Sequence, residues 1–538
     1  MDGLNMRRMK FWGWGFEGEN ATPQEREGVL RMAAERFGAA IVDTSPPREE
    51  EIELPRPRVS PPASLEKFCT SARIDRLIHT YGKSFVDSVK VFERKFDHAP
   101  DVVAYPASEQ DIVDLLDWAA RANVAVIPFG GGSSVVGGVE PVVGDAFAGT
   151  VTVNLRRLNK VLEVDRKSRA ARIQAGALGP ELEAQLAPHG LTLRHFPQSF
   201  QYSTLGGWVA TRSGGHFATL YTHIDDFVES IRTVTPRGTM ESFRLPGSGA
   251  GPSPDRMMIG SEGSLGIITE CWMRLQDKPT FRAGTSALFS DYHKAAEAVR
   301  AVAQAGLYPS NLRLLDRNEA LNTGAGDGTR DVLVMAFESA DHDVGPWMKR
   351  ALECVADHGG QIDTGQLEAK GGHREGASGA WRNAFIRMPF FREIMTPLGL
   401  IFDTYETSIT WDRFPEFHAR MMQVTADIVR RVCGGTTSVT CRFTHVYPDG
   451  PAPYFSFYGK GKKGQMAEQF WEIKRAASDE LIKLGGTITH HHAVGRDHMP
   501  WYRKQRPELF GAALAGAKAA LDPAGVMNPG VIVDAKRR

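Results

Sequence analysis

The segment Pro128-Phe-Gly-Gly-Gly-Ser-Ser-Val135 is the strongest indication of fold in this 538-residue chain. It directly follows the apolar run VAVIPFG (124–130), which is typical of a buried β-strand. Its three glycines allow successive backbone N–H groups to turn toward one point as an anion-binding nest, and its two serines add hydroxyl groups. We therefore expect this loop to hold a pyrophosphate; the alternative is an ordinary turn after a strand.

The loop differs from the two common nucleotide-binding patterns. Val135 occupies the position of the third glycine in the Rossmann fingerprint, and the Gly-Lys-Ser/Thr end of a Walker A loop is missing. Residues 459–464 (GKGKKG) do match GxGxxG, but Asp479 and Glu480, the acids that follow, lie within the same helical window. We interpret residues 459–464 as a basic surface turn.

Two later segments share the small and hydroxyl-bearing character of the first loop. They are QSFQYSTLGGWVATRSGG (198–215) and GSEGSLGIITE (260–270). A lone phosphate would need only one such loop. Three of them in one region predict a backbone that wraps along an extended ligand.

Composition and charge exclude several classes of protein. The 64 basic and 64 acidic residues sum to a net charge of zero, which gives no indication of a nucleic-acid-binding protein. The sequence contains no apolar run long enough to predict a membrane-spanning helix. The N-terminus lacks the apolar core of a signal peptide. The five cysteines form no CxxC pair, and the C-terminal AKRR is not a peroxisomal signal. We expect a cytoplasmic protein with reduced thiols.

Changes in sequence texture divide the chain into parts. A helix is predicted over 23–37, followed by a proline-rich extended connector over 45–62. A second helix begins at Ser108, which has acidic residues directly after it. We predict four parts: an N-terminal helical region with the connector (1–97), a ligand-binding domain of short strands (98–277), an α+β domain (278–480) and a C-terminal return segment (481–538).

The three loops, in this order and spacing, resemble the flavin-binding domain of the vanillyl-alcohol-oxidase-type FAD family. The resemblance implies an α+β fold with a two-subdomain FAD-binding domain over 98–277, an α+β cap domain for the substrate over 278–480, and a final segment that returns to the flavin. No histidine lies in the first loop, so we expect the FAD to be non-covalent. The flavin contacts that the resemblance implies are Pro128, Phe129, Gly130, Gly131, Gly132, Ser133, Ser134, Gln198, Ser199, Phe200, Gln201, Tyr202, Ser203, Thr204, Thr211, Arg212, Ser213, Gly214, Glu262, Gly263, Ser264, Leu265, Gly266, Ile267 and Ile268.

Over most of its length the chain also resembles the alkylglycerone-phosphate (alkyl-dihydroxyacetone-phosphate) synthase family. The matching segments are MKFWGWGFEG near the start, PRG (236–238), Arg392 placed 19 residues before Trp411, CRFTHVYPDGPAPYFSF (441–457) and GGTITHHHAVG (485–495). The resemblance implies a transferase that exchanges the fatty acid of acyl-dihydroxyacetone phosphate for a fatty alcohol, without net redox change. The alternatives are an FAD-dependent D-2-hydroxyacid dehydrogenase or oxidase and a flavin-containing binding protein without turnover.

The histidine triplet offers two chemistries. His490, His491 and His492 follow an apparent strand, so alternate rings would face the same way. His490 and His492 could then bind a metal ion, with His498 as a third ligand. Beside a flavin, acid–base catalysis by the triplet is the favoured interpretation, because imidazole titrates near neutral pH. The predicted site therefore contains no metal ligand.

Arg392 and its surroundings predict where the substrate binds. An arginine among hydrophobic residues needs an anion, either a phosphate or an acid such as Glu406. The segment WRNAFIRMPFFREIMTPLGLIF (381–402) could line a tunnel for lipid chains or could be buried core. The glycine-rich residues 370–379 before it are a candidate mobile gate.

The resemblance assigns roles to these residues. Arg392 holds the phosphate, His491 of the triplet takes a proton from the carbon beside the ketone, and Tyr454 relays a proton to the departing carboxylate. The expected partners are the two lipid substrates and a second copy of the chain in a homodimer. Peripheral membrane contact follows from the lipid substrates.

Overall fold

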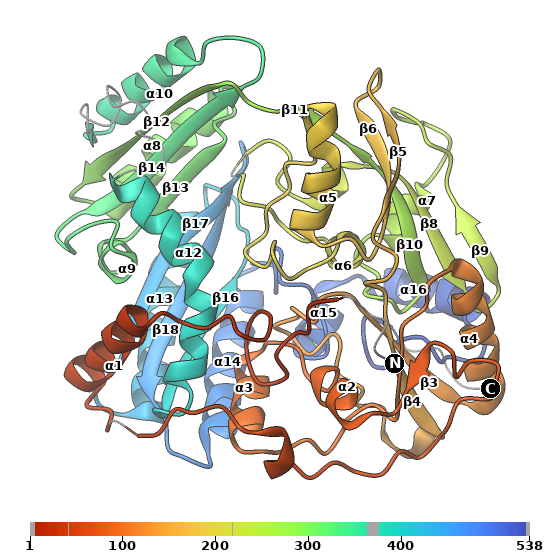
Figure 1. The fold of residues 1–538 in the computed structure, drawn as a ribbon. Coiled ribbons are helices and arrows are strands. Elements are labelled where there is room, and N and C mark those ends of the chain that lie inside the picture. The colour runs from red at the N-terminus through yellow and green to blue at the C-terminus, as the bar shows by residue number, and fades with distance from the viewer. Residues whose placement is uncertain (1–5, 41, 218, 363–375, 534–538) are drawn as a thin grey trace.

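The computed structural model describes residues 6–40, 42–217, 219–362 and 376–533. Figure 1 shows a large sheet on the left of the molecule and smaller sheets on the right. The N-terminal segment runs along the lower edge of the molecule, between these two regions. Helices and strands both occur along the whole described chain, as the sequence predicts for an α+β protein.

The first loop leaves a four-stranded sheet. Helix α4 (Glu109–Ala122) begins after Ser108, whose hydroxyl accepts the N–H of Asp111 at 3.2 Å, so the predicted start of this helix is confirmed. The predicted strand before the loop is also confirmed, and residues 130–135 leave its carboxyl end. The strands lie in the order β1 (Cys69–Thr70), β2 (Val102–Ala104), β4 (Gly149–Asn154), β3 (Val124–Phe129), with β4 parallel to β2 and β3.

An antiparallel five-stranded sheet lies beside it. Leu182, Leu205 and Trp208 bury the helices α5 (Gly179–Leu186) and α6 (Leu205–Thr211) against its apolar face. The strands lie in the order β5 (Val161–Asp165), β6 (Ala170–Gln174), β10 (Ile267–Arg274), β8 (Val228–Thr235), β9 (Gly238–Glu241). The accompanying short elements are β7 (Leu191–Thr192), which pairs with β11 (Gln276–Asp277), and α7 (Pro254–Met258).

The large sheet has helices on both faces, because successive side chains of a strand point to opposite faces and apolar residues occur on both. In β14, Leu333 and Met335 pack toward one group of helices, while Val332 and Val334 pack with Trp381 on the opposite face. The strand order is β15 (Gln361–Ile362), β12 (Phe281–Phe289), β14 (Asp331–Ser339), β13 (Asn311–Leu315), β17 (Ser438–Val446), β18 (Pro451–Lys460), β16 (Leu400–Glu406). The first face carries α8 (Tyr292–Gln304), α10 (Gly345–Asp357), α13 (Phe414–Cys433) and α14 (Met466–Lys483), and the second carries α9 (Arg317–Thr323) and α12 (Gly376–Met395).

The N-terminal segment joins the two regions. The predicted helix over 23–37 is confirmed as α1 (Pro23–Phe37), which packs on α12, and the connector over 45–62 contains no helix or strand apart from one 3₁₀ turn. Lys10 forms a salt bridge of 3.0 Å with Glu393 of α12. Two short helices follow, α2 (Arg73–Ile78) and α3 (Phe85–Phe92). Residues 370–375 of the candidate gate lie outside the described residues, and α12 begins at Gly376.

The C-terminal segment returns to the first sheet through α15 (Met499–Gln505) and α16 (Glu508–Leu521). The N–H of Val126 in β3 donates to the carbonyl oxygen of Val526 at 2.8 Å. The predicted strand before the histidine triplet is wrong: residues 485–495 form turns and loop, because the N–H groups of the triplet converge on a carboxylate instead of a neighbouring strand. The predicted surface turn over 459–464 is confirmed for residues 461–464, where Lys462 and Lys463 are exposed, whereas Gly459 and Lys460 are the last residues of β18 and Gly459 is buried.

Candidate active site

A cleft of about 1120 Å³ lies where the first loop faces residues 197–215. A Cβ atom on Gly131 would lie 1.6 Å from the carbonyl oxygen of Tyr202, and one on Gly130 would lie 2.2 Å from Oγ1 of Thr204. Glycine is therefore required for the two loops to approach this closely. The predicted flavin residues that line the cleft are Gly130, Gly131, Gly132, Ser133, Ser134, Gln198, Ser199, Ser203, Thr204, Thr211, Ser213 and Gly214.

The chemistry of the cleft fits a flavin dinucleotide. The glycine N–H groups and serine hydroxyls of the first loop suit a pyrophosphate. Three further lining residues have buried polar atoms with no hydrogen-bond partner among the described residues: Nε of Arg313, Nε of Arg442 and Nδ1 of His445. Unsatisfied buried donors and acceptors are costly, so these atoms are suited to contact a bound ligand.

The third predicted loop (260–270) packs in the core and does not line the cleft. Leu265, Ile267 and Ile268 are buried in the apolar cores. The carboxylate of Glu262 accepts the N–H groups of Val494 and Gly495 at 2.8 and 2.9 Å, although burial raises its pKa to about 7. This loop thus joins the C-terminal segment to the flavin region. The predicted residues outside the cleft lining are Pro128, Phe129, Phe200, Gln201, Tyr202, Arg212, Glu262, Gly263, Ser264, Leu265, Gly266, Ile267 and Ile268.

The histidine triplet is held from beneath by Glu406 at the end of β16. Its carboxylate accepts the main-chain N–H groups of His490, His491 and His492, the last at 2.9 Å. It also accepts the hydroxyl of Thr489 at 2.6 Å. These hydrogen bonds fix the main chain at the triplet, so the three rings project from one anchored turn.

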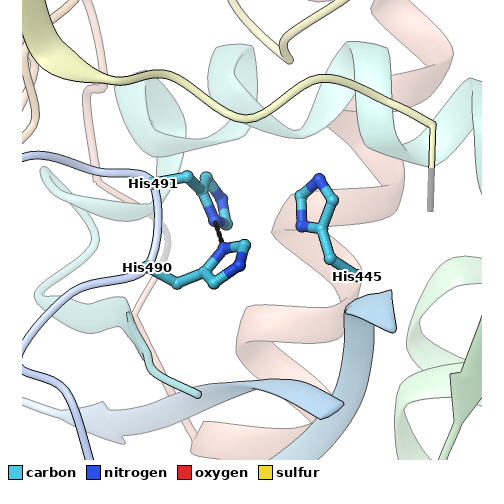
Figure 2. Close-up of side chains that lie close together, drawn as sticks. All are labelled: His445, His490 and His491. Carbon is cyan, nitrogen blue, oxygen red and sulfur yellow. Dashed lines mark hydrogen bonds between the residues drawn. The ribbon is translucent and has the colours of Figure 1, made fainter. Parts of the chain in front are cut away.

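The rings of the triplet point in different directions. Figure 2 shows His490 and His491 projecting from one loop toward His445 of β17. Nδ1 of His490 lies 3.1 Å from Nδ1 of His491, and its Nε2 lies 2.7 Å from the hydroxyl of Tyr447. Nε2 of His445 lies 2.9 Å from the carbonyl oxygen of Gly215, which orients that ring. Both nitrogens of His490 thus have hydrogen-bond partners.

The alternative metal set of His490, His492 and His498 is not assembled. Nδ1 of His498 lies 2.9 Å from the carbonyl oxygen of Ala493, and this ring is buried. Without a strand at the triplet, alternate rings do not share a face. The histidine that does join His490 and His491 is His445, with nitrogen atoms of all three within 4.8 Å of one another. Sequence analysis missed His445, although it lies within the segment 441–457.

Tyr454 lies beside the triplet in β18. Its hydroxyl is 2.9 Å from Oγ1 of Thr404, and its ring is stacked with that of His491 at a centroid distance of 6.0 Å. The guanidinium of Arg442 lies 3.9 Å from the ring centroid. Arg442 is itself paired with the buried Glu319. Tyr454 therefore meets both a histidine and a cation inside the protein.

A second, inner cavity of about 1010 Å³ adjoins the flavin cleft and contains Arg392. Arg392 forms a salt bridge of 2.9 Å with Asp403 and donates to the carbonyl oxygen of Lys83 at 3.1 Å. The alternative of an ion pair between Arg392 and an acid is thus present, but the acid is Asp403, and Glu406, which was named as an example, faces the triplet. Of the segment 381–402, Met388 and Pro389 line this cavity while Trp381 is buried core, so the two interpretations each describe part of it. The residues shared by the two cavities are Trp14, Val135, Gln198, Arg442, Tyr454 and His492.

Burial sets the protonation of these groups. It lowers the pKa of His491 well below its usual value of 6.5, and nearby Glu406 only partly opposes this. It raises the pKa of Tyr454, against the effect of Arg442. Burial also acts to raise the pKa of Glu406, but the histidines and the hydrogen bonds to its oxygens outweigh this and hold that pKa well below 4.5. At neutral pH the site thus contains a neutral imidazole, a protonated phenol and a carboxylate.

Comparison with known proteins identifies the family. Residues 100–244 match the model described as an FAD binding domain, and residues 278–532 match the C-terminal domain of FAD linked oxidases. The alkyldihydroxyacetonephosphate synthase of Dictyostelium discoideum is 30% identical over 535 residues, which cover 93% of this chain and 85% of that protein. The chain belongs to the alkyldihydroxyacetonephosphate synthase family. The Caenorhabditis elegans synthase is likewise 30% identical, over 93% of this chain and 86% of its own.

A solved alkyldihydroxyacetonephosphate synthase structure has the same architecture. It superposes with a TM-score of 0.79 at 26% identity and covers 97% of this chain and 98% of its own. Family membership therefore confirms the predicted two-domain FAD-binding fold and FAD as the cofactor. Beyond the predicted set, the structure adds Glu406, Asp403, Arg442 and His445 to the candidate site.

Proposed function

We propose that this protein is an FAD-dependent synthase that exchanges the acyl chain of acyl-dihydroxyacetone phosphate for a fatty alcohol. The observation that carries the proposal is that Tyr454 and His492 lie where the flavin cleft meets the inner cavity of Arg392. A substrate with its phosphate near Arg392 would place its triose beside these groups. Identity of 30% to synthases along nearly the whole chain supports this activity over that of a D-2-hydroxyacid dehydrogenase or oxidase.

In the proposed reaction, the bond between the triose and the fatty-acid oxygen breaks, and a bond to the alcohol oxygen forms. FAD, when bound, supplies the reactive ring that makes this exchange feasible. Neutral His491 accepts a proton from the carbon beside the ketone and later returns it. Tyr454 gives a proton to the departing carboxylate and regains one from the alcohol. Arg392 orients the phosphate, and Glu406 fixes the triplet.

We infer that the predicted division of the chain serves this reaction. Residues 98–277 would bind the flavin and residues 278–480 would bind the substrate, with residues 1–97 bridging the two. Residues 481–538 would bring the triplet to the flavin. The hydrogen bonds from Val494 and Gly495 to Glu262 support a close link between the last segment and the flavin-binding region.

Peripheral membrane contact is part of the proposal, because both substrates are lipids. Within the described residues, no helix combines the length and apolarity needed to cross a bilayer. Leu509 and Phe510 at the start of α16 are 84% and 52% exposed, and the exposed Arg503 precedes them in the chain at α15. This pairing suits an anionic lipid surface. In a flotation assay, the protein should float with phosphatidylserine vesicles, and the variant carrying Leu509→Ser and Phe510→Ser should not. The homodimer is a prediction that light scattering on a sizing column tests.

The experiment that tests the activity is product analysis by mass spectrometry. Purified FAD-loaded protein is mixed with palmitoyl-dihydroxyacetone phosphate and hexadecanol. Formation of the alkyl ether with release of palmitate supports the synthase. No ether, together with bleaching of the flavin by D-lactate or a related acid, would instead identify a hydroxyacid dehydrogenase or oxidase. Neither reaction would identify a binding protein without turnover.

A further inference from the structure

Lys474 of α14 is a buried cation that forms no salt bridge with any described residue. Its side chain lines the inner cavity, and the residue is only 6% exposed. Its ammonium group donates one long hydrogen bond, of 3.4 Å, to the carbonyl oxygen of Thr404. Among the described residues, no carboxylate lies within salt-bridge distance of it.

Lys83 is a second such cation in the same cavity. Its ammonium group lies 3.4 Å from the carbonyl oxygen of Lys10, and the described residues again provide no salt bridge. Burial lowers the pKa of Lys83 to about 8, although Asp87 and Glu393 oppose this. Asp87, which lines the same cavity, accepts the N–H of Ser84 at 2.9 Å through one oxygen, and its Oδ1 has no hydrogen-bond partner among the described residues.

The other cations around this cavity are already paired. Arg392 is bound to Asp403 at 2.9 Å, and Lys10 is bound to Glu393 at 3.0 Å. Arg442 is bound to Glu319. Arg392 can therefore donate hydrogen bonds to a bound anion, but Asp403 already compensates its charge. The two lysines are the cations of this cavity that form no salt bridge among the described residues. Two acids still face them: Asp87 lines the same cavity, and burial raises the pKa of Asp497 to about 7 against the effect of Lys474.

A buried ammonium group without a partner is unfavourable, and a bound anion removes that penalty. A phosphate monoester carries between one and two negative charges at neutral pH and presents three acceptor oxygens. Lysine binds phosphate as a point charge, whereas arginine binds it through its planar fork. Two lysines and one arginine thus match a phosphate monoester in both charge and geometry.

We infer that Lys474 and Lys83 complete, with Arg392, a subsite for a phosphate monoester and that this subsite selects a phosphorylated triose over the free triose. The inference rests on the proposed function for the identity of the triose. Lys474 is a specificity-determining residue in this account, since it acts on the phosphate and not on the reacting carbon. The same cavity without its two lysines would hold no net positive charge for the phosphate.

The test measures binding of dihydroxyacetone phosphate and of dihydroxyacetone to the FAD-loaded protein by titration calorimetry. Lys474→Met should raise the Kd for dihydroxyacetone phosphate at least tenfold and leave that for dihydroxyacetone unchanged. Lys83→Met should have the same direction of effect, and Lys474→Arg should restore part of the affinity. Lys483→Met is the matched control, because Lys483 lies on the same helix with a 71% exposed side chain paired to Glu480.

Thermal unfolding separates phosphate recognition from a structural role. Without ligand, Lys474→Met should unfold at the same or a higher temperature than the parent protein, because it removes an unpaired buried charge. Dihydroxyacetone phosphate should stabilise the parent and Lys483→Met but not Lys474→Met. A lower unfolding temperature with unchanged affinity would overturn the inference.

The outcomes for the subsite and for the proposed function are distinguishable. Exchange of acyl for alkyl by the parent, with unchanged phosphate affinity in Lys474→Met, would overturn the subsite and leave the function. No exchange, with affinity that still depends on Lys474, would overturn the function and leave the subsite. No exchange and no dependence on Lys474 would overturn both.

Discussion

Both carboxylate oxygens of Glu406 accept the main-chain N–H of His491, at 3.1 and 3.2 Å. Glu406 ends β16, whereas His491 lies in a loop 85 residues later. The side chain of Glu406 is 2% exposed, so this carboxylate is an internal anchor. The position of the candidate base therefore depends on a residue that does not line the cleft.

Replacing Glu406 with glutamine should misplace the triplet. The amide would retain one acceptor oxygen and would direct an N–H₂ group toward main-chain donors, at a cost of about 1–3 kcal/mol in stability. Because small displacements of catalytic groups are costly, kcat should fall by about 10²-fold. The measurement is steady-state exchange together with the unfolding temperature. Glu472→Gln, an exposed glutamate on α14, is the control. Unchanged kcat in Glu406→Gln would remove the anchor from the mechanism.

Replacing Tyr454 with phenylalanine should separate chemistry from stability. The hydrogen bond to Thr404 is worth about 0.5–1.5 kcal/mol, whereas a proton donor in the transition state contributes about 10²–10⁴-fold to the rate. Tyr405→Phe is a matched control, since its buried hydroxyl lies 2.6 Å from Oγ1 of Thr425 and outside both cavities. Both variants should lose similar stability, and only Tyr454→Phe should lose activity. Equal activities would exclude Tyr454 as a proton donor.

Arg392→Ala should raise KM for acyl-dihydroxyacetone phosphate at least tenfold, since a bidentate phosphate contact is worth at least about 1.4 kcal/mol. Flavin content should stay near that of the parent, because Arg392 does not line the flavin cleft. Arg387→Ala on the same helix is the control, since Arg387 pairs with Glu25 instead. The readouts are KM and the ratio of flavin to protein absorbance. Parallel loss of flavin would show that Arg392 acts on the fold.

The flavin-binding region was predictable because its signals are local. Glycine and hydroxyl residues in the first loop directly follow a strand, and Ser108 marks the start of a helix in its own segment. Such features depend on neighbours in the chain. The side chains of Ile267 and Ile268 could not be placed in this way, because their burial depends on how β10 pairs with β8.

The partners within the site were not predictable, because they depend on three-dimensional packing. Asp403 and Glu406 are three residues apart in one strand, so their side chains leave opposite faces. The sequence does not say which face meets Arg392 and which meets the triplet. His445 joins the triplet across 45 residues, through the position of β17. The main-chain N–H groups of the triplet donate to Glu406, so they do not form the strand pairing that the sequence predicted.

The rate should be insensitive to pH across neutrality. His491 must be neutral to accept a proton, and its pKa lies well below 6.5 because it is buried. Tyr454 must be protonated, and burial raises its pKa above 10. We expect kcat at saturating substrate to be flat from about pH 6.5 to 9 and to fall only in more acidic solution. In contrast, kcat/KM should also fall above about pH 8, where Lys83 of the phosphate subsite loses its proton. A profile with an acid limb centred near 6.5 would contradict the assignment.

The same burial predicts the direction in which His491 affects stability. Its pKa is lower in the folded state than in the unfolded state, so the unfolded chain binds the proton first as pH falls. Its contribution to the free energy of unfolding therefore decreases below about pH 6.5. His491→Gln should weaken the dependence of unfolding temperature on pH between 5 and 6.5. An unchanged dependence would indicate an imidazole that is not buried in solution.

A side chain at Gly207 should block the flavin without disturbing the fold. Gly207 lines the cleft from α6, and a Cβ atom there would meet only Oγ1 of Thr204, at 3.3 Å. Gly207→Val should therefore yield a folded but colourless protein, because its methyl groups occupy the space for the cofactor. Gly516→Val tests the same substitution in α16, where a Cβ atom would meet nothing within 4 Å. The measurements are flavin absorbance and circular dichroism. Full yellow colour in Gly207→Val would mean that the flavin lies elsewhere, whereas lost ellipticity in both variants would reflect a cost of valine to the helix.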